Sequence, residues 1–79
     1  MMDLRRLIEA VLFSSPKPLK LKTLFKRLDG YKDDDIKQAL RELTEEYRNS
    51  DRSIEIVPVS GGYQMRTKVE YREWVKRIS

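Results

Sequence analysis

The chain of 79 residues carries 17 Lys and Arg against 13 Asp and Glu, a formal net charge of +4, and contains neither Cys nor His. These missing residue types exclude disulfides, thiolate metal sites and the commonest general base. No apolar run approaches the roughly 18 residues of a membrane span, and the charged start MMDLRRLIEAVLF is not expected to be a signal peptide. A chain this short makes one domain, residues 1–79, with a small core.

Three amphipathic helices are expected within the first 48 residues. Asp3 is a suitable cap for a helix over about Leu4–Phe13, whose apolar residues recur with the period of one buried helical face. A second helix covers about Leu21–Leu28, and Gly30 in the following turn can adopt a positive φ. The third helix spans about Asp33–Arg48 and again has one apolar stripe.

The segment Ile54–Thr67, IEIVPVSGGYQMRT, is typical of two strands joined by a tight turn, which we expect at Gly61-Gly62. Leu19 is expected to form a short strand that pairs beside this hairpin. Pro58 cannot donate a ladder hydrogen bond, so its strand should lie at an edge of the sheet or end there. The pattern Thr67-Lys68-Val69-Glu70 resembles a capping box and predicts the start of a fourth helix.

The fourth helix has an apolar stripe at helical spacing. Its members are Tyr71, Trp74, Val75 and Ile78. The resulting order is helix, strand, helix, helix, strand, strand, helix. It predicts an α+β fold, a winged helix-turn-helix with three helices, a two-stranded wing and a C-terminal helix. Winged helices usually bind DNA or another protein, so these are the two functions to be separated.

Charge is distributed unevenly along the chain. Five basic residues and no acid lie between Ser14 and Leu28, whereas Asp33–Arg48 carries six acids against three bases. The second helix of a DNA-reading helix-turn-helix enters the major groove, where carboxylates would face the phosphates. Sequence-specific reading by Asp33–Arg48 is therefore not expected. One edge of this helix could still approach the DNA backbone through a polar and basic stripe made of Lys37, Arg41, Thr44 and Arg48. The possible phosphate contacts are Lys17, Lys20, Lys22, Lys26, Arg66 and Lys68.

No set of residues predicts catalysis or a cofactor. Consecutive helical residues point about 100° apart, so Asp33, Asp34 and Asp35 cannot converge on one metal ion and instead compensate the helix dipole. Gly61-Gly62 lacks the Lys-Ser/Thr pair and the strand-to-helix context of a phosphate-binding loop. Without a nucleophile beside a base, or a set of metal ligands, the chain is not expected to be an enzyme.

Aromatic and flexible apolar residues are numerous near the wing. A domain this small cannot bury Tyr63, Met65, Tyr71 and Trp74 together with the aromatic residues nearer the N-terminus, which are Phe13, Phe25, Tyr31 and Tyr47. Some should be exposed, and exposed aromatic residues and Met favour a protein-binding patch. The candidate contact residues are Tyr63, Met65, Tyr71 and Trp74, with Phe13 on the first helix as an alternative surface.

Three segments carry a resemblance to a known family: LIEAVLFSSPKPL (Leu7–Leu19), LRELTEEY (Leu40–Tyr47) and IEIVPVSGGYQMRTKVEYREWVKRI (Ile54–Ile78). With its Gly-Gly-Tyr wing tip, its Arg-Thr pair and its Tyr-x-x-Trp-Val helix, the chain resembles the amino-terminal winged-helix domain of segregation and condensation protein B. In that family a second winged helix usually follows.

The resemblance implies a non-enzymatic subunit of the SMC complex, which organises and segregates chromosomes in the cytoplasm at the nucleoid. It further implies a homodimer that binds the kleisin, segregation and condensation protein A, and through it the SMC heads. No cofactor and no membrane are implied, and contact with DNA would be weak or indirect. The alternative is a DNA-binding winged-helix transcription regulator that uses the basic residues given above.

Overall fold

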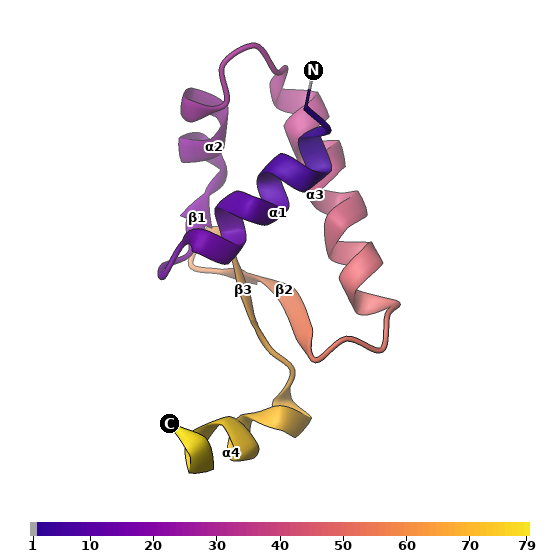
Figure 1. Ribbon diagram of the computed structural model, residues 1–79. Helices are drawn as coiled ribbons and strands as arrows, with labels where there is room; N and C mark the ends of the chain where they lie inside the picture. Colours follow the sequence, from indigo (N-terminus) through magenta and orange to yellow (C-terminus); the bar gives the residue numbers. More distant parts are fainter. Residues whose placement is uncertain (1) are drawn as a thin grey trace.

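A computed structural model describes residues 2–79. Its elements are α1 (Leu4–Ser14), β1 (Leu19–Lys20), α2 (Leu21–Arg27), α3 (Asp33–Arg48), β2 (Ile54–Val59), β3 (Gly62–Thr67) and α4 (Val69–Ile78). The first three helices and the sheet make one body, and α4 lies beyond it at the far end of β3 (Figure 1). This arrangement confirms the predicted winged helix. Among residues 2–79, no helix is long and apolar enough to span a membrane.

The core lies where α1 and α3 cross and is closed by α2 and the sheet. Its buried members are Ile8, Leu12, Leu24, Ile36, Ala39, Leu40, Leu43, Tyr47 and Ile56. They come from the apolar stripes that the sequence predicts. Asp3 caps α1 as expected, because its carboxylate accepts the backbone N–H of Arg5 at 3.0 Å. Most of the body's stability therefore comes from packing of amphipathic helical faces, as is usual for short helices.

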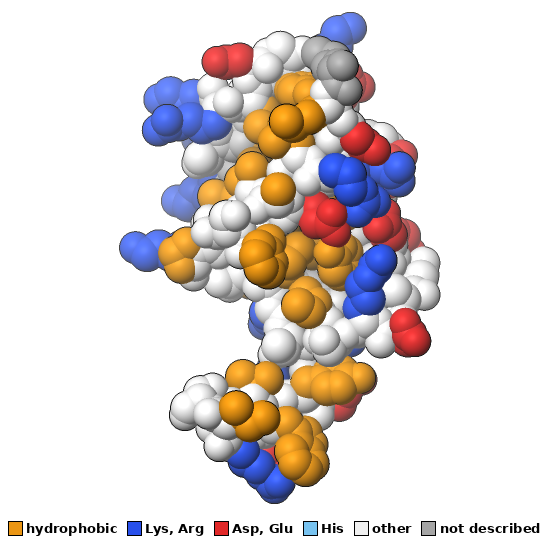
Figure 2. Space-filling view, in the orientation of Figure 1, with side chains coloured by type: hydrophobic (Ala, Val, Ile, Leu, Met, Phe, Trp, Pro, Cys, Tyr) orange, Lys and Arg blue, Asp and Glu red, His pale blue; other side chains and the backbone are white. Residues whose placement is uncertain are grey.

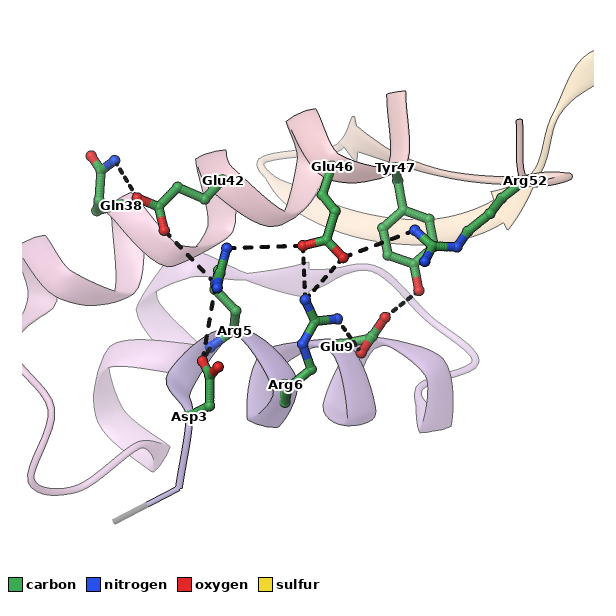
Figure 3. A network of polar contacts seen from close by, with 9 residues as sticks. All are labelled: Asp3, Arg5, Arg6, Glu9, Gln38, Glu42, Glu46, Tyr47 and Arg52. Carbon is green, nitrogen blue, oxygen red and sulfur yellow. Dashed lines mark hydrogen bonds and ion pairs between the residues drawn. The ribbon is translucent and has the colours of Figure 1, made fainter. Parts of the chain in front are cut away.

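A polar network links α1 to α3 above this core (Figure 3). Arg6 donates to both carboxylate oxygens of Glu46, at 2.8 and 2.9 Å, and to Glu9 at 2.9 Å. The Tyr47 hydroxyl donates to the other oxygen of Glu9. This hydrogen bond is the main cause that lowers the pKa of Glu9, while burial raises the pKa of Tyr47. The network fixes how α1 lies on α3.

The sheet is antiparallel with the strand order β1-β3-β2. Leu19 forms the predicted short strand beside the hairpin, where it pairs with Tyr63, and Pro58 is exposed on the edge strand β2. The predicted turn at Gly61-Gly62 is wrong by one residue. The turn residues are Ser60 and Gly61, with φ of 50° and 77°, the positive values that a two-residue hairpin turn requires.

Gly62 is the first residue of strand β3, so its role differs from that of the turn residue Gly61. It pairs with Val59 on one side and with Lys20 on the other. A Cβ added to Gly62 would lie 2.5 Å from the carbonyl oxygen of Leu19. Glycine is needed here because β1 approaches closely, and the second glycine of the pair is therefore explained by packing of β1 on β3.

The predicted capping box is also wrong. Thr67 is still paired with Ile54 in the sheet, so the cap position of α4 falls on Lys68, whose side chain makes no capping bond. The Lys68 backbone N–H donates to the Ser53 carbonyl at 2.7 Å, and its ammonium group donates to the Ser50 carbonyl at 3.0 Å. These bonds tie the start of α4 to the segment that joins α3 to β2.

Candidate protein-interaction surface

Helix α4 presents its apolar stripe to solvent. None of its residues is buried, and none belongs to the core or to the partly buried apolar residues packed around it. The stripe residues are Tyr71, Trp74, Val75 and Ile78, which are 40%, 60%, 46% and 86% exposed. Figure 2 shows hydrophobic side chains gathered on α4, separate from the body. Spacings of three, four and seven residues place all four on one side of the helix, so they form a continuous apolar face.

The attachment of α4 to the body is polar. Arg72 donates from Nε to the Thr67 carbonyl at 3.3 Å, and its guanidinium also lies 3.4 Å from Glu55 on β2. Arg66 pairs with the same carboxylate at 3.2 Å.

Helix α4 is short. Isolated helices shorter than about 12 residues are marginal in water, and α4 has 10 residues. Its apolar face therefore needs a partner surface if the helix is to be stable.

Trp74 is the largest side chain of the stripe and is 60% exposed. The Arg77 guanidinium lies 4.6 Å from the centroid of its ring, and Arg77 also pairs with Glu73 at 3.2 Å. The cation–π contact and the ion pair favour one position of the indole before any partner arrives. A large aromatic side chain that is held in place loses little rotamer freedom on binding.

The five candidate contact residues are divided by the structure. Tyr71 and Trp74 lie on the exposed stripe, and Phe13 at the end of α1 is 76% exposed. Tyr63 and Met65 are half-buried and pack against the core. Val75 and Ile78 are predicted as members of the stripe but not as contact residues. Their helical spacing with Trp74 is the sequence signal that places them on the same exposed face.

A groove of about 680 Å³ runs between α3 and the hairpin. It is lined by Gln38, Arg41, Glu42, Thr44, Glu45, Arg48, Pro58 and Tyr63. Arg48 pairs with Glu45 at 2.8 Å, and Arg41 donates to Gln38 at 2.6 Å. The two arginines of the basic stripe are thus engaged with neighbours on α3 and interleaved with acids, while the Lys37 ammonium group lies 5.8 Å from the centroid of the Phe25 ring on α2. This arrangement is unfavourable for entry into a DNA groove.

The six possible phosphate contacts also fall into two groups. Lys17, Lys20, Lys22 and Lys26 are exposed on α2, on β1 and in the loop before it. By contrast, Arg66 pairs with Glu55, and the Lys68 ammonium group is bonded to a backbone carbonyl. The structure brings together the first four residues and separates them from the other two.

Comparison with known proteins decides the family. A family model described as segregation and condensation complex subunit ScpB matches residues 6–79. The chain belongs to this family. Segregation and condensation protein B of Syntrophotalea carbinolica is 38% identical over 78 residues, which cover 96% of this chain and 38% of that protein. The relative from Clostridioides difficile is 34% identical over 77 residues, covering 96% of this chain and 43% of its own.

The chain thus spans about two fifths of the length of these curated relatives. A solved structure, a dimer of the ScpB N-terminal domain complexed with ScpA peptide, is similar to this chain with a TM-score of 0.86 and 24% identity. The similarity covers 100% of this chain and 94% of the solved chain. At this identity the likeness shows the fold alone, which is the fold of that N-terminal domain.

Proposed function

We propose that this chain is a non-enzymatic subunit of an SMC–kleisin complex that acts in chromosome condensation and segregation. In this proposal it pairs with a second copy of itself and binds the kleisin, segregation and condensation protein A. It works in the cytoplasm at the nucleoid. Family membership supports the role, and a relative of the same fold has been solved as a dimer with a peptide of segregation and condensation protein A.

The exposed stripe of α4 is the observation that carries the proposal. An apolar face of four large side chains is unusual on a monomer and typical of an interface. A second copy is the natural cover because a two-fold dimer places the same apolar patch on both sides of the contact. Trp74 would then lie near the centre and the charged residues of α4 at the rim, which is the usual anatomy of an interface.

The alternative of a transcription regulator that reads the major groove is less well supported. The helix that would enter the groove carries a net charge of −3, and its arginines are engaged with their own neighbours. A sequence-specific reader needs side chains free to bind base edges. The surface of α3 does not favour that chemistry.

Sedimentation and co-purification test the proposal together. The purified chain should sediment as a dimer and should co-purify with a tagged fragment of segregation and condensation protein A. Charge reversal at Lys22 and Lys26, which lie away from α4, should leave both results unchanged and serves as the control. A chain that is monomeric at high concentration and fails to retain the kleisin fragment would overturn the proposal.

A further inference from the structure

The solvent face of α2 and the segment before it form a surface of free basic side chains. We call it the lysine row, and its members are Lys17, Lys20, Lys22, Lys26 and Arg27. All five are exposed, and within residues 2–79 none of their side chains takes part in an ion pair or a hydrogen bond. No Asp or Glu occurs between Glu9 and Asp29.

Outside the lysine row, most arginines are paired with carboxylates. Seven arginines lie within 4.0 Å of a carboxylate, and they are Arg5, Arg6, Arg48, Arg52, Arg66, Arg72 and Arg77. Their charges are largely neutralised where they stand. The lysine row therefore gathers five cations that have no carboxylate partner in the described part of the chain on one side of the molecule, where Figure 2 shows basic side chains projecting along the edge formed by α2 and β1.

The segments that carry the lysine row are held together. Lys22 and Lys26 lie one turn apart on α2, about 6 Å along its axis, opposite the buried Leu24. Lys20 pairs with Gly62 beside the hairpin turn. The loop that contains Lys17 is fixed to β3 because Gln64 donates to the Pro16 carbonyl at 3.4 Å. The backbone segments that carry the row are thus held next to one another.

Its chemistry fits nucleic acid better than protein. Protein interfaces are depleted in Lys and depend on apolar or aromatic anchors, and no large hydrophobic side chain between residues 15 and 28 is exposed. Contacts to phosphates need only accessible cations, and they carry no sequence information. We propose that the lysine row binds the phosphate backbone of double-stranded DNA without reading its sequence. This contact goes beyond the proposed dimer and kleisin subunit, and it leaves the α4 stripe free.

The salt dependence of DNA binding gives a quantitative test. Five phosphate contacts, one from each member of the row, predict a slope of log K against log salt of about −4.5, so affinity should fall about 500-fold from about 50 to 200 mM salt. Fluorescence anisotropy of two unrelated labelled duplexes measures both the slope and the absence of sequence preference. The double variant Lys22→Ala/Lys26→Ala removes two contacts and leaves three, so its slope should be about −2.7 and its loss over the same range about 40-fold. Alanine on exposed α2 positions keeps the helix.

A matched control removes the same charge elsewhere. The double variant Arg41→Ala/Lys76→Ala takes one cation from α3 and one from α4, both outside the lysine row, and should keep the wild-type slope. Three results would overturn the proposal: no binding at about 50 mM salt, equal slopes for the two double variants, or displacement of DNA by polyglutamate at equal charge. The last result would point to an acidic protein segment. Sedimentation of the same samples reports the dimer separately, so the two proposals can fail independently.

Discussion

The replacement of Trp74 by alanine tests whether the α4 stripe forms the dimer. The indole is 60% exposed in the single chain and lies at the centre of the stripe. Trp74→Ala removes this surface and leaves the polar attachment of α4 through Arg72 and Lys68 untouched. Because alanine has the highest helix propensity, the variant should not weaken α4 through its own conformational preference. A change in association would therefore report the lost contact.

The expected loss follows from the exposed area. A large aromatic side chain has about 150–250 Å² of surface to bury, so the 60% that is exposed amounts to roughly 90–150 Å². At about 25 cal/mol per Å² this is roughly 2–4 kcal/mol per copy and about 4–8 kcal/mol for a two-fold dimer if burial is complete. Burial is usually incomplete and its gain is partly offset. We expect the Kd to rise at least about 100-fold, which is about 2.7 kcal/mol.

Sedimentation equilibrium over a wide concentration range measures this Kd directly. Val69→Ser is the matched control, because Val69 is 69% exposed on the same helix and lies about 140° around the axis from Trp74. Phe13→Ser tests the alternative surface on α1. The reasoning fails if Trp74→Ala associates as tightly as the wild-type chain, or if Phe13→Ser is the variant that dissociates.

Other predictions concern the body and the state of α4. Tyr47→Phe removes the bond that lowers the pKa of Glu9. Its free energy of unfolding should fall by about 1.5–3 kcal/mol at neutral pH. The Glu9 carboxylate stabilises the fold only while it is ionised. The difference in unfolding free energy between the wild-type chain and Tyr47→Phe, measured by urea titration, should therefore shrink as pH falls from about 4.3 through the lower folded-state pKa of Glu9. A difference that stays constant with pH would contradict this. Gly62→Ala should lower the melting temperature more than Gly61→Ala, because its Cβ meets the Leu19 carbonyl; equal effects would refute the packing argument. Amide exchange in α4 should slow as protein concentration rises, and concentration-independent exchange would count against a covered helix.

Sequence patterns predict most of the body because short-range physics determines it. The spacing of apolar residues and the capping and turn residues locate α1, α2 and α3 to within a residue, and the bounds of α3 agree fully. The two local errors have tertiary causes. Val59 pairs with Gly62, which moves the turn one residue back, and Thr67 remains in the sheet, which moves the helix cap one residue forward.

The candidate interaction surface could be predicted only in part. Helical periodicity identifies which side of α4 is apolar, but it does not say whether the cover comes from the same chain or from another. In the structure the stripe lies outside the core, so the body of the same chain does not cover it. Tyr63 and Met65 have the same residue types as exposed contacts, yet the two-residue period of β3 turns them toward the core. For Lys68, no sequence signal reveals that its ammonium group is bonded to a carbonyl.

The central claim is that a second copy covers the α4 stripe, and the native fluorescence of the chain tests it most directly. Trp74 is the single tryptophan, so emission and acrylamide quenching report its environment without any label. We predict that, as concentration rises, the emission shifts to the blue and quenching falls, following the same curve as the dimer fraction from sedimentation. An indole that stays fully accessible in samples that sediment as dimers would show that another face forms the dimer and would contradict the claim.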